Sequence, residues 1–93
     1  FIGGTAALMK YLSSNIKYPT ISQETGSQGK VIVQFVVDRD GTISNPEVVR
    51  GVDPYLDKEA IRVISSMPKW TPGVQNGKKV RVKYTVPVSF RLQ

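Results

Sequence analysis

Residues 29–50 read GKVIVQFVVDRDGTISNPEVVR, and this stretch decides the fold. Apolar side chains occupy every second position from Val31 to Val37, which predicts a β-strand. The sequence Asp-Arg-Asp-Gly at positions 38–41 predicts a tight turn, because glycine supplies the positive φ that short hairpin loops need. Residues 43–49 are expected to return as a second strand. The rest of the chain must cover or extend this β-hairpin.

The first strand of the hairpin carries apolar residues on both faces, since Ile32 and Val36 lie between the residues of the main stripe. A strand that is apolar on both faces is typical of the middle of a sheet. The second strand contains Pro46, which has no N–H to donate and is tolerated at a sheet edge. We therefore expect the first strand to be central and the second to be peripheral.

The segment before the hairpin predicts an amphipathic helix. Leu8, Leu12 and Ile16 recur every four residues, Thr5 is the expected N-cap, and Pro19 is expected to stop the helix. Residues 20–29 are polar and contain glycine, which predicts a connection outside the core.

A second helix is predicted after the hairpin. Asp53 is a favourable N-cap, Pro54 suits the first helical position, and Pro68 is expected to end the helix. Trp70 is expected to close the core as a lid, Met9 is expected to fill the core, and residues 74–77 are expected to form a loop. The residues expected to be buried on this helix are Leu56, Ala60, Val63, Ile64 and Met67.

The last segment alternates apolar and polar residues throughout, which predicts a third strand with one packed face and one solvated face. If this strand lies beside the first one, the sheet is fully antiparallel and has the order 2-1-3. The predicted fold class is α+β, with two helices on one face of a three-stranded antiparallel sheet and the element order α-β-β-α-β. The packed face is expected to hold Val80, Val82, Tyr84, Val86, Val88, Phe90 and Leu92.

Length and composition indicate a single domain over residues 1–93. No apolar run approaches the roughly 18 residues of a membrane span. The chain does not begin with Met, and we expect it to be a piece of a longer protein. The charge is uneven, because residues 69–93 contain no acid. The net charge of +6 comes from Lys69, Lys78, Lys79, Arg81, Lys83 and Arg91.

The residue types argue against an enzyme. The chain contains no Cys and no His, which excludes thiolate chemistry, imidazole catalysis and nearly all zinc sites, and we expect no metal and no cofactor. Residues 38–41 resemble half of a calcium loop, but the flanking strands and Val36 at the first ligand position favour a plain hairpin turn. Nucleic acid is not an expected partner, because the exposed basic positions lack aromatic rings on which bases could stack.

The third strand is expected at an edge of the sheet, where its backbone N–H and C=O groups have no neighbouring strand. Its charged side chains have a simple explanation, because charge on an edge strand deters aggregation. The same edge could accept an extended peptide as an additional strand, or a second copy of the chain as a homodimer. Pro87 cannot donate a hydrogen bond, so pairing is expected to favour the residues before it.

Several motifs, spread over nearly the whole chain, resemble those of the C-terminal domain of TonB, the energy transducer of Gram-negative bacteria. The resemblance lies in their order and spacing together. They are Tyr18-Pro19, GKVIVQFVV at residues 29–37, DGTI at 40–43, LDKEA at 56–60, MPKWTPG at 67–73 and VPVSF at 86–90. The opening FIGG at residues 1–4 is similar to the Phe-Pro-Gly-Gly of one TonB-like subgroup, with Ile2 in place of Pro. Pro46 departs from the usual family pattern and is expected to shorten the second strand.

The resemblance implies this fold and also a function. Family members are periplasmic domains of proteins tethered to the inner membrane by an N-terminal helix and a proline-rich spacer. They capture the TonB box, a short extended segment of an outer-membrane transporter, as an extra strand beside the last strand. The ExbB–ExbD complex couples proton motive force to uptake of siderophores, vitamin B12 or glycans. Similar domains are fused to BlaR-type membrane metallopeptidases. The alternative to an energy-transducing module is therefore an interaction or sensory domain of such a peptidase or of another envelope protein.

Carried over to this chain, the resemblance implies a partner-binding segment on the last strand, with Tyr18 and Pro19 nearby. The residues of this segment are Val80, Arg81, Val82, Lys83, Tyr84, Thr85 and Val86.

Overall fold

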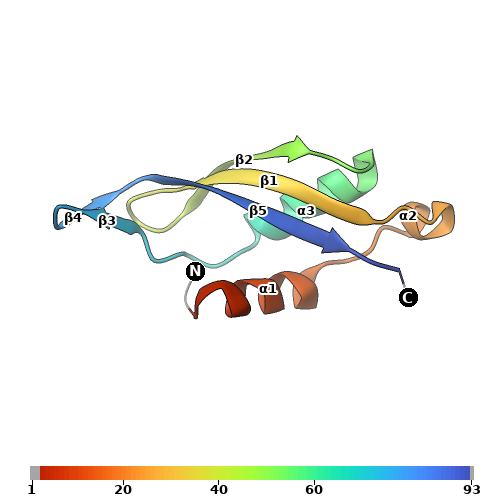
Figure 1. The fold of residues 1–93 in the computed structure, drawn as a ribbon, viewed down its shortest axis with the longest axis horizontal. Helices are drawn as coiled ribbons and strands as arrows, with labels where there is room; N and C mark the ends of the chain where they lie inside the picture. Colours follow the sequence, from red (N-terminus) through yellow and green to blue (C-terminus); the bar gives the residue numbers. More distant parts are fainter. Residues whose placement is uncertain (1–2, 93) are drawn as a thin grey trace.

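The computed structural model describes residues 3–92, so Phe1 and Ile2 of the FIGG motif and Gln93 lie outside the described residues. The molecule is elongated, with principal extents of 50 × 22 × 16 Å. Its elements are α1 (Gly4–Asn15), α2 (Thr20–Thr25), β1 (Gly29–Val37), β2 (Ile43–Arg50), α3 (Pro54–Ser65), β3 (Gly73–Gln75), β4 (Lys78–Val80) and β5 (Val82–Phe90) (Figure 1).

The main sheet has the strand order β2-β1-β5, and both pairs are antiparallel. β1 pairs with β5 in an unbroken register, from Gly29 opposite Phe90 to Val37 opposite Val82. This arrangement confirms the predicted α+β class and the predicted order 2-1-3, with β5 as the third strand. It also confirms that the apolar strand β1 is central.

The core lies between the sheet and the helices, and α3 runs behind β1 and β5 in Figure 1. The alternating residues of β1 that begin the hairpin are fully buried, as is Leu56 at the start of α3. Every residue predicted to be buried on the second helix is buried, although α3 itself ends at Ser65, before Met67. The buried hydrophobic residues are Leu8, Leu12, Val31, Val33, Phe35, Val37, Leu56, Ala60, Val63, Ile64, Met67, Trp70, Val86, Val88 and Phe90.

The turn between β1 and β2 is tied to the segment that follows α3. Gly41 adopts a φ of 87°, as the turn prediction required, and its N–H donates to the Asp38 carbonyl at 2.9 Å. Its own carbonyl accepts from the Trp70 N–H at 2.8 Å. A Cβ atom at position 41 would lie 2.2 Å from the Trp70 carbonyl oxygen. Glycine is therefore required both for the conformation and for the close approach of the two backbones.

Predictions about the first helix and about the segment after it were wrong. Thr5 is not the N-cap of the first helix, because α1 starts at Gly4 after Gly3, whose φ of 91° suits glycine. Residues 20–25 are not a connection outside the core but the short helix α2, bounded by Pro19 and by Gly26 in a left-handed conformation. Ser22 of this helix is fully buried.

Asp53 links α2 to α3. Its carboxylate accepts the Leu56 N–H at 2.7 Å, as predicted for an N-cap, and the Ser22 hydroxyl at 3.0 Å. The Leu56 N–H in particular lowers the pKa of Asp53, against the opposing effect of burial. The polar residue at position 22 is therefore buried because it has a charged acceptor there.

A second hairpin replaces the loop predicted at residues 74–77. Asn76 and Gly77 both have positive φ values, 52° and 75°, which is the requirement of a type I′ turn, and β3 pairs with β4 across it. The hairpin projects beyond the end of the main sheet (Figure 1). The predicted third strand is accordingly divided at Arg81, whose Nε lies 2.8 Å from Asp38 Oδ1.

Candidate functional site

Within residues 3–92, β5 pairs only with β1, so its outer side is an edge of the sheet. The last five residues of the predicted partner-binding segment, residues 82–86, lie on this edge. Val80 does not, because it lies in β4 and pairs with Gly73, and Arg81 lies between the two strands.

The two edges of the sheet differ in regularity. The pairing of β2 with β1 has two register shifts, and β2 contains Asn45 at a φ of 51° followed by Pro46. Bulges on an edge strand hinder pairing with a further strand. β5 instead runs in regular register for nine residue pairs. Of the two edges, β5 is the one suited to accept another strand.

Two hydrogen bonds at the ends of the β1–β5 ladder show in which direction the backbone groups point. Just after β1, the Asp38 N–H donates to the Thr42 carbonyl, on the β2 side, at 2.8 Å. Just after β5, the Leu92 N–H donates to the Gln28 side chain, on the β1 side, at 3.2 Å. Along a regular strand, the backbone N–H and C=O groups of successive residues point alternately to one neighbouring strand and to the other. Both bonds indicate that even-numbered residues of β5 pair with β1.

From this alternation, we infer that the N–H groups of Lys83, Thr85 and Ser89 face away from the sheet. Pro87 also faces away from the sheet, so its lack of an N–H costs no hydrogen bond between β1 and β5. An incoming strand therefore finds two donors before Pro87 and one after it.

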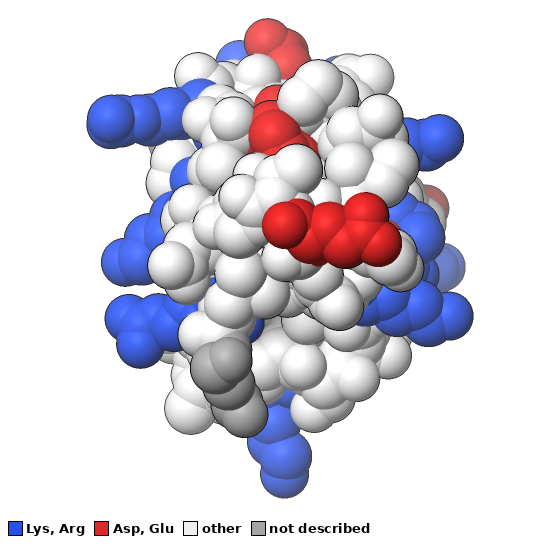
Figure 2. Space-filling model, turned by 90° about the vertical axis from the view of Figure 1, so that its right-hand side faces the viewer, with Lys and Arg blue, Asp and Glu red and all other residues white. Residues whose placement is uncertain are grey.

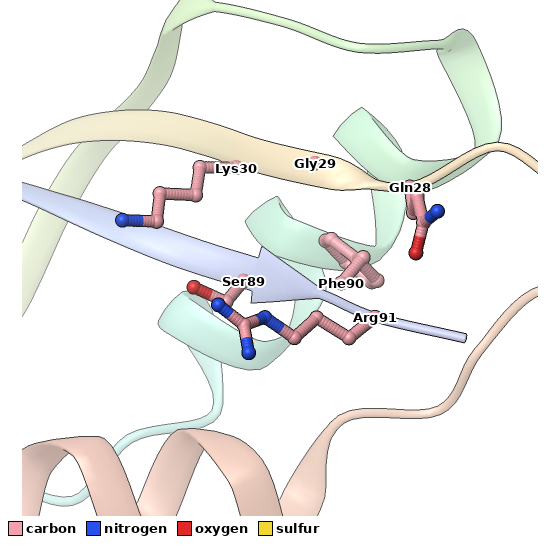
Figure 3. A pocket seen from close by; sticks show the side chains of 6 residues that line it. All are labelled: Gln28, Gly29, Lys30, Ser89, Phe90 and Arg91. Carbon is pink, nitrogen blue, oxygen red and sulfur yellow. The ribbon is translucent and has the colours of Figure 1, made fainter. Parts of the chain in front are cut away.

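The open face of this edge is basic. Lys83, Thr85 and Ser89 are exposed on β5, while Val86, Val88 and Phe90 are buried on its other face. A hollow of about 240 Å³ at the end of the strand is lined by residues that include Lys30 of β1, Ser89 and Arg91. Figure 3 shows these side chains. Figure 2, seen from this end, shows Lys and Arg side chains on both flanks of the molecule. The exposed Lys30, Lys83 and Arg91 at this edge favour acidic groups in a partner.

An aromatic cluster supports the other face of β5. The ring of Trp70 lies 5.2 Å from that of Phe35 and 5.0 Å from that of Tyr84, measured between centroids. Trp70 is 5% exposed, which confirms its predicted place as a lid on the core. The cluster fixes the first half of β5 against β1 without occupying the outer edge.

Tyr18 and Pro19 lie at the other end of the strand. The Tyr18 ring packs edge-on against Phe90 at 5.6 Å, and its hydroxyl donates to the Ser27 carbonyl. Burial, together with the charge of Asp53, raises the pKa of Tyr18. The structure therefore places Tyr18 and Pro19 away from residues 80–86, beside the last residues of β5.

The sequence profile of a family described as "Gram-negative bacterial TonB protein C-terminal" matches residues 14–92. The chain belongs to this family. Within residues 3–92, no helix is long and apolar enough to cross a membrane.

Two curated relatives of this TonB C-terminal domain are longer proteins called Protein TonB. Protein TonB of Haemophilus influenzae is 32% identical over 85 residues, which cover 87% of this chain and 32% of that protein. Protein TonB of Helicobacter pylori strain 26695 is 26% identical over 83 residues, which cover 88% of this chain and 28% of that protein. The chain thus spans about a third or less of the length of these relatives.

Two solution NMR structures of the Helicobacter pylori TonB C-terminal domain have the same fold. The first has a TM-score of 0.73 and 22% identity, and the match covers 100% of this chain and 89% of that one. The second has a TM-score of 0.70 and 24% identity, with coverages of 92% and 90%. At this identity the likeness shows the fold.

A buried carboxylate, which the sequence reasoning did not single out, holds the Tyr18-Pro19 segment of this TonB C-terminal domain in place. Glu59 of α3 is 8% exposed. It accepts the Lys17 N–H at 2.6 Å and two bonds from the Arg62 guanidinium at 2.6 and 2.7 Å. Arg62 also donates to the Asn15 carbonyl at 2.9 Å. Burial acts to raise the pKa of Glu59, but these donors hold it below its ordinary value.

Glu59→Gln is expected to lower the free energy of unfolding by about 2 kcal/mol at pH 7, because Arg62 and the Lys17 N–H lose a charged acceptor. The folded pKa is lower than the unfolded one, so this contribution is complete above the unfolded value of about 4.3 and is lost as the pH falls through the folded value. Urea unfolding from pH 7 down to pH 3 should show the difference between the two proteins shrinking. A difference that is constant with pH, or equal to that of the exposed control Glu24→Gln, would contradict this role.

Proposed function

We propose that this domain is a non-enzymatic binding module that captures an extended peptide from an outer-membrane transporter as a fourth strand beside β5. The observation that carries the proposal is the regular outer edge of β5, with the N–H groups of Lys83 and Thr85 directed away from the sheet. Membership of the TonB C-terminal family supports the identity of the partner. The peptide we propose is the TonB box of such a transporter.

The whole protein is proposed to be a TonB-type energy transducer. In this proposal the domain lies in the periplasm, and parts of the protein beyond these residues anchor it in the inner membrane and contact ExbB and ExbD. The relatives called Protein TonB, which are about three times as long as the region matched here, support this arrangement. The domain then transmits pull from the inner membrane to the transporter during active uptake.

The energetics of the edge suit a reversible coupling. Each backbone hydrogen bond to the added strand contributes roughly 0.5–1.5 kcal/mol net. The stretch before Pro87 offers the outward N–H and carbonyl groups of two residues, Lys83 and Thr85. Backbone pairing alone therefore gives weak binding, and further affinity must come from side chains of the peptide.

The direct experiment is an NMR titration of the ¹⁵N-labelled domain with a TonB-box peptide from a transporter of the same organism. The amide signals of Lys83 and Thr85 should shift first and in proportion to occupancy. The matched control is the same peptide with alternate backbone nitrogens methylated, which keeps every side chain but removes donors to β5. Shifts concentrated around Tyr18 and Pro19, or equal binding of the methylated peptide, would overturn the proposal.

A further inference from the structure

A hollow of about 360 Å³ lies between α1 and the outer part of β5. We call it the α1–β5 groove and define it by six of its lining residues, which are Thr5, Leu8, Met9, Trp70, Tyr84 and Pro87. Leu8 and Trp70 are buried, at 6% and 5% exposure, whereas Met9 is 38% exposed. The prediction that Met9 fills the core was therefore wrong, since about a third of its surface faces solvent.

The groove continues along the strand. Met9 and Pro87 also line a second, smaller hollow of about 60 Å³, whose other lining residues include Leu12 and Val88. The two hollows share these residues and follow the same pair of elements, α1 and β5. Figure 1 shows α1 running alongside β5 on the side away from β1. An added strand at this edge would therefore lie over α1.

Strand geometry then determines what enters the groove. Side chains of a β-strand alternate between the two faces of its sheet. On β5 itself, Tyr84 and Val86 point to the helical face, and Lys83 and Thr85 to the open face. Every second side chain of an added strand must therefore point toward α1, and the others must lie beside Lys83 and Thr85. The largest part of the groove borders residues 84–87, next to the outward N–H of Thr85.

The basic residues of this region determine which side chains suit the open face of an added strand, opposite the groove. Residues 69–93 contain six basic residues and no acid, and Lys79, Lys83 and Arg91 are exposed. Acidic side chains on the open face of an added strand would meet this positive field. The same strand would present apolar side chains to Leu8, Met9 and Tyr84.

We propose that the α1–β5 groove is a side-chain specificity pocket, which takes one large apolar residue of the docked peptide while neighbouring acidic residues lie on the open face. The inference rests on the proposed function, because it requires strand addition at β5. Backbone pairing is nearly independent of sequence, so the groove is what allows the domain to distinguish one extended segment from another.

The test compares two blocked peptides, Thr-Ser-Asp-Leu-Asp-Ser-Thr and the same sequence with Ala in place of Leu, on three proteins. The proteins are the unaltered domain, Thr5→Trp, which fills the groove from an exposed position, and Ser14→Trp, an exposed position of α1 outside it. The unaltered domain and Ser14→Trp should bind the Leu peptide about tenfold more tightly than the Ala peptide. In Thr5→Trp this preference should fall below about twofold, while the Ala peptide still shifts the Lys83 and Thr85 amides.

The outcomes separate the two proposals. Equal binding of both peptides to the unaltered domain, with shifts at Lys83 and Thr85, would overturn the specificity pocket and leave strand addition intact. A Leu preference that persists in Thr5→Trp would place the apolar residue elsewhere and would also overturn the pocket. No shift at these amides with either peptide at millimolar concentration would overturn both proposals.

Discussion

Gly41→Ala is expected to destabilise the domain by about 3 kcal/mol. A left-handed conformation costs alanine roughly 1–2 kcal/mol. The new Cβ would also lie 2.2 Å from the Trp70 carbonyl oxygen, so the turn must move and weaken the 2.8 Å bond from the Trp70 N–H. For a domain of this size, the melting temperature should fall by roughly 12–24 °C, as measured by circular dichroism.

The matched control for this substitution is Gly77→Ala in the projecting hairpin. Gly77 also has a positive φ, 75°, but nothing lies within 4 Å of a Cβ placed there. Gly77→Ala should therefore lower the free energy of unfolding only by the conformational cost of the left-handed backbone, about 1 kcal/mol. Equal costs at the two glycines would show that the contact between the β1–β2 turn and Trp70 does not stabilise the fold.

Thr85→Pro is expected to weaken binding of the proposed transporter peptide at least about tenfold, because it removes an outward N–H and places a ring where the added strand would lie. The strand itself should stay folded, since the inferred direction of this N–H is away from β1. Binding is measured by isothermal titration, and the fold by the dispersion of the amide NMR spectrum.

Two substitutions control for effects other than the lost donor. Thr85→Val keeps the N–H and the branched side chain, so it should bind as the unaltered domain does. Ser89→Pro also removes an outward N–H, but beyond Pro87, and should change affinity by no more than about twofold. A loss in Ser89→Pro as large as that in Thr85→Pro would mean that the peptide pairs along all of β5 or that proline disturbs the strand itself.

The long, regular elements of the fold were predictable because their sequence patterns repeat. The alternation in β1 and the four-residue spacing in α1 and α3 each extend over several turns or pleats, and the structure confirms them except at Ile16, which lies after the end of α1. The α2 helix has only six residues, too few for a period to be visible, and its buried Ser22 depends on Asp53, 31 residues away. The hairpin of β3 and β4 had a local signal, Asn76-Gly77, which the sequence reasoning did not use.

The candidate site was predictable in part. Alternation and Pro46 were sufficient to place the last strand at an edge, but they did not predict the break at Arg81, which forms an ion pair with Asp38 of the turn between β1 and β2. The direction of each N–H followed only from hydrogen bonds at the two ends of the ladder. The α1–β5 groove could not be read from the sequence, because the helical spacing of Met9 is equally compatible with a core position, and its exposure depends on where α1 lies relative to β5.

Strand addition at β5 is tested most directly by hydrogen exchange of single amides with and without the peptide. With the peptide at 100 times its Kd, exchange at Lys83 and Thr85 should slow by about a hundredfold, because both N–H groups become bonded in the complex. Unchanged exchange at these two amides, with new protection on β2 or around Tyr18 instead, would contradict docking at β5.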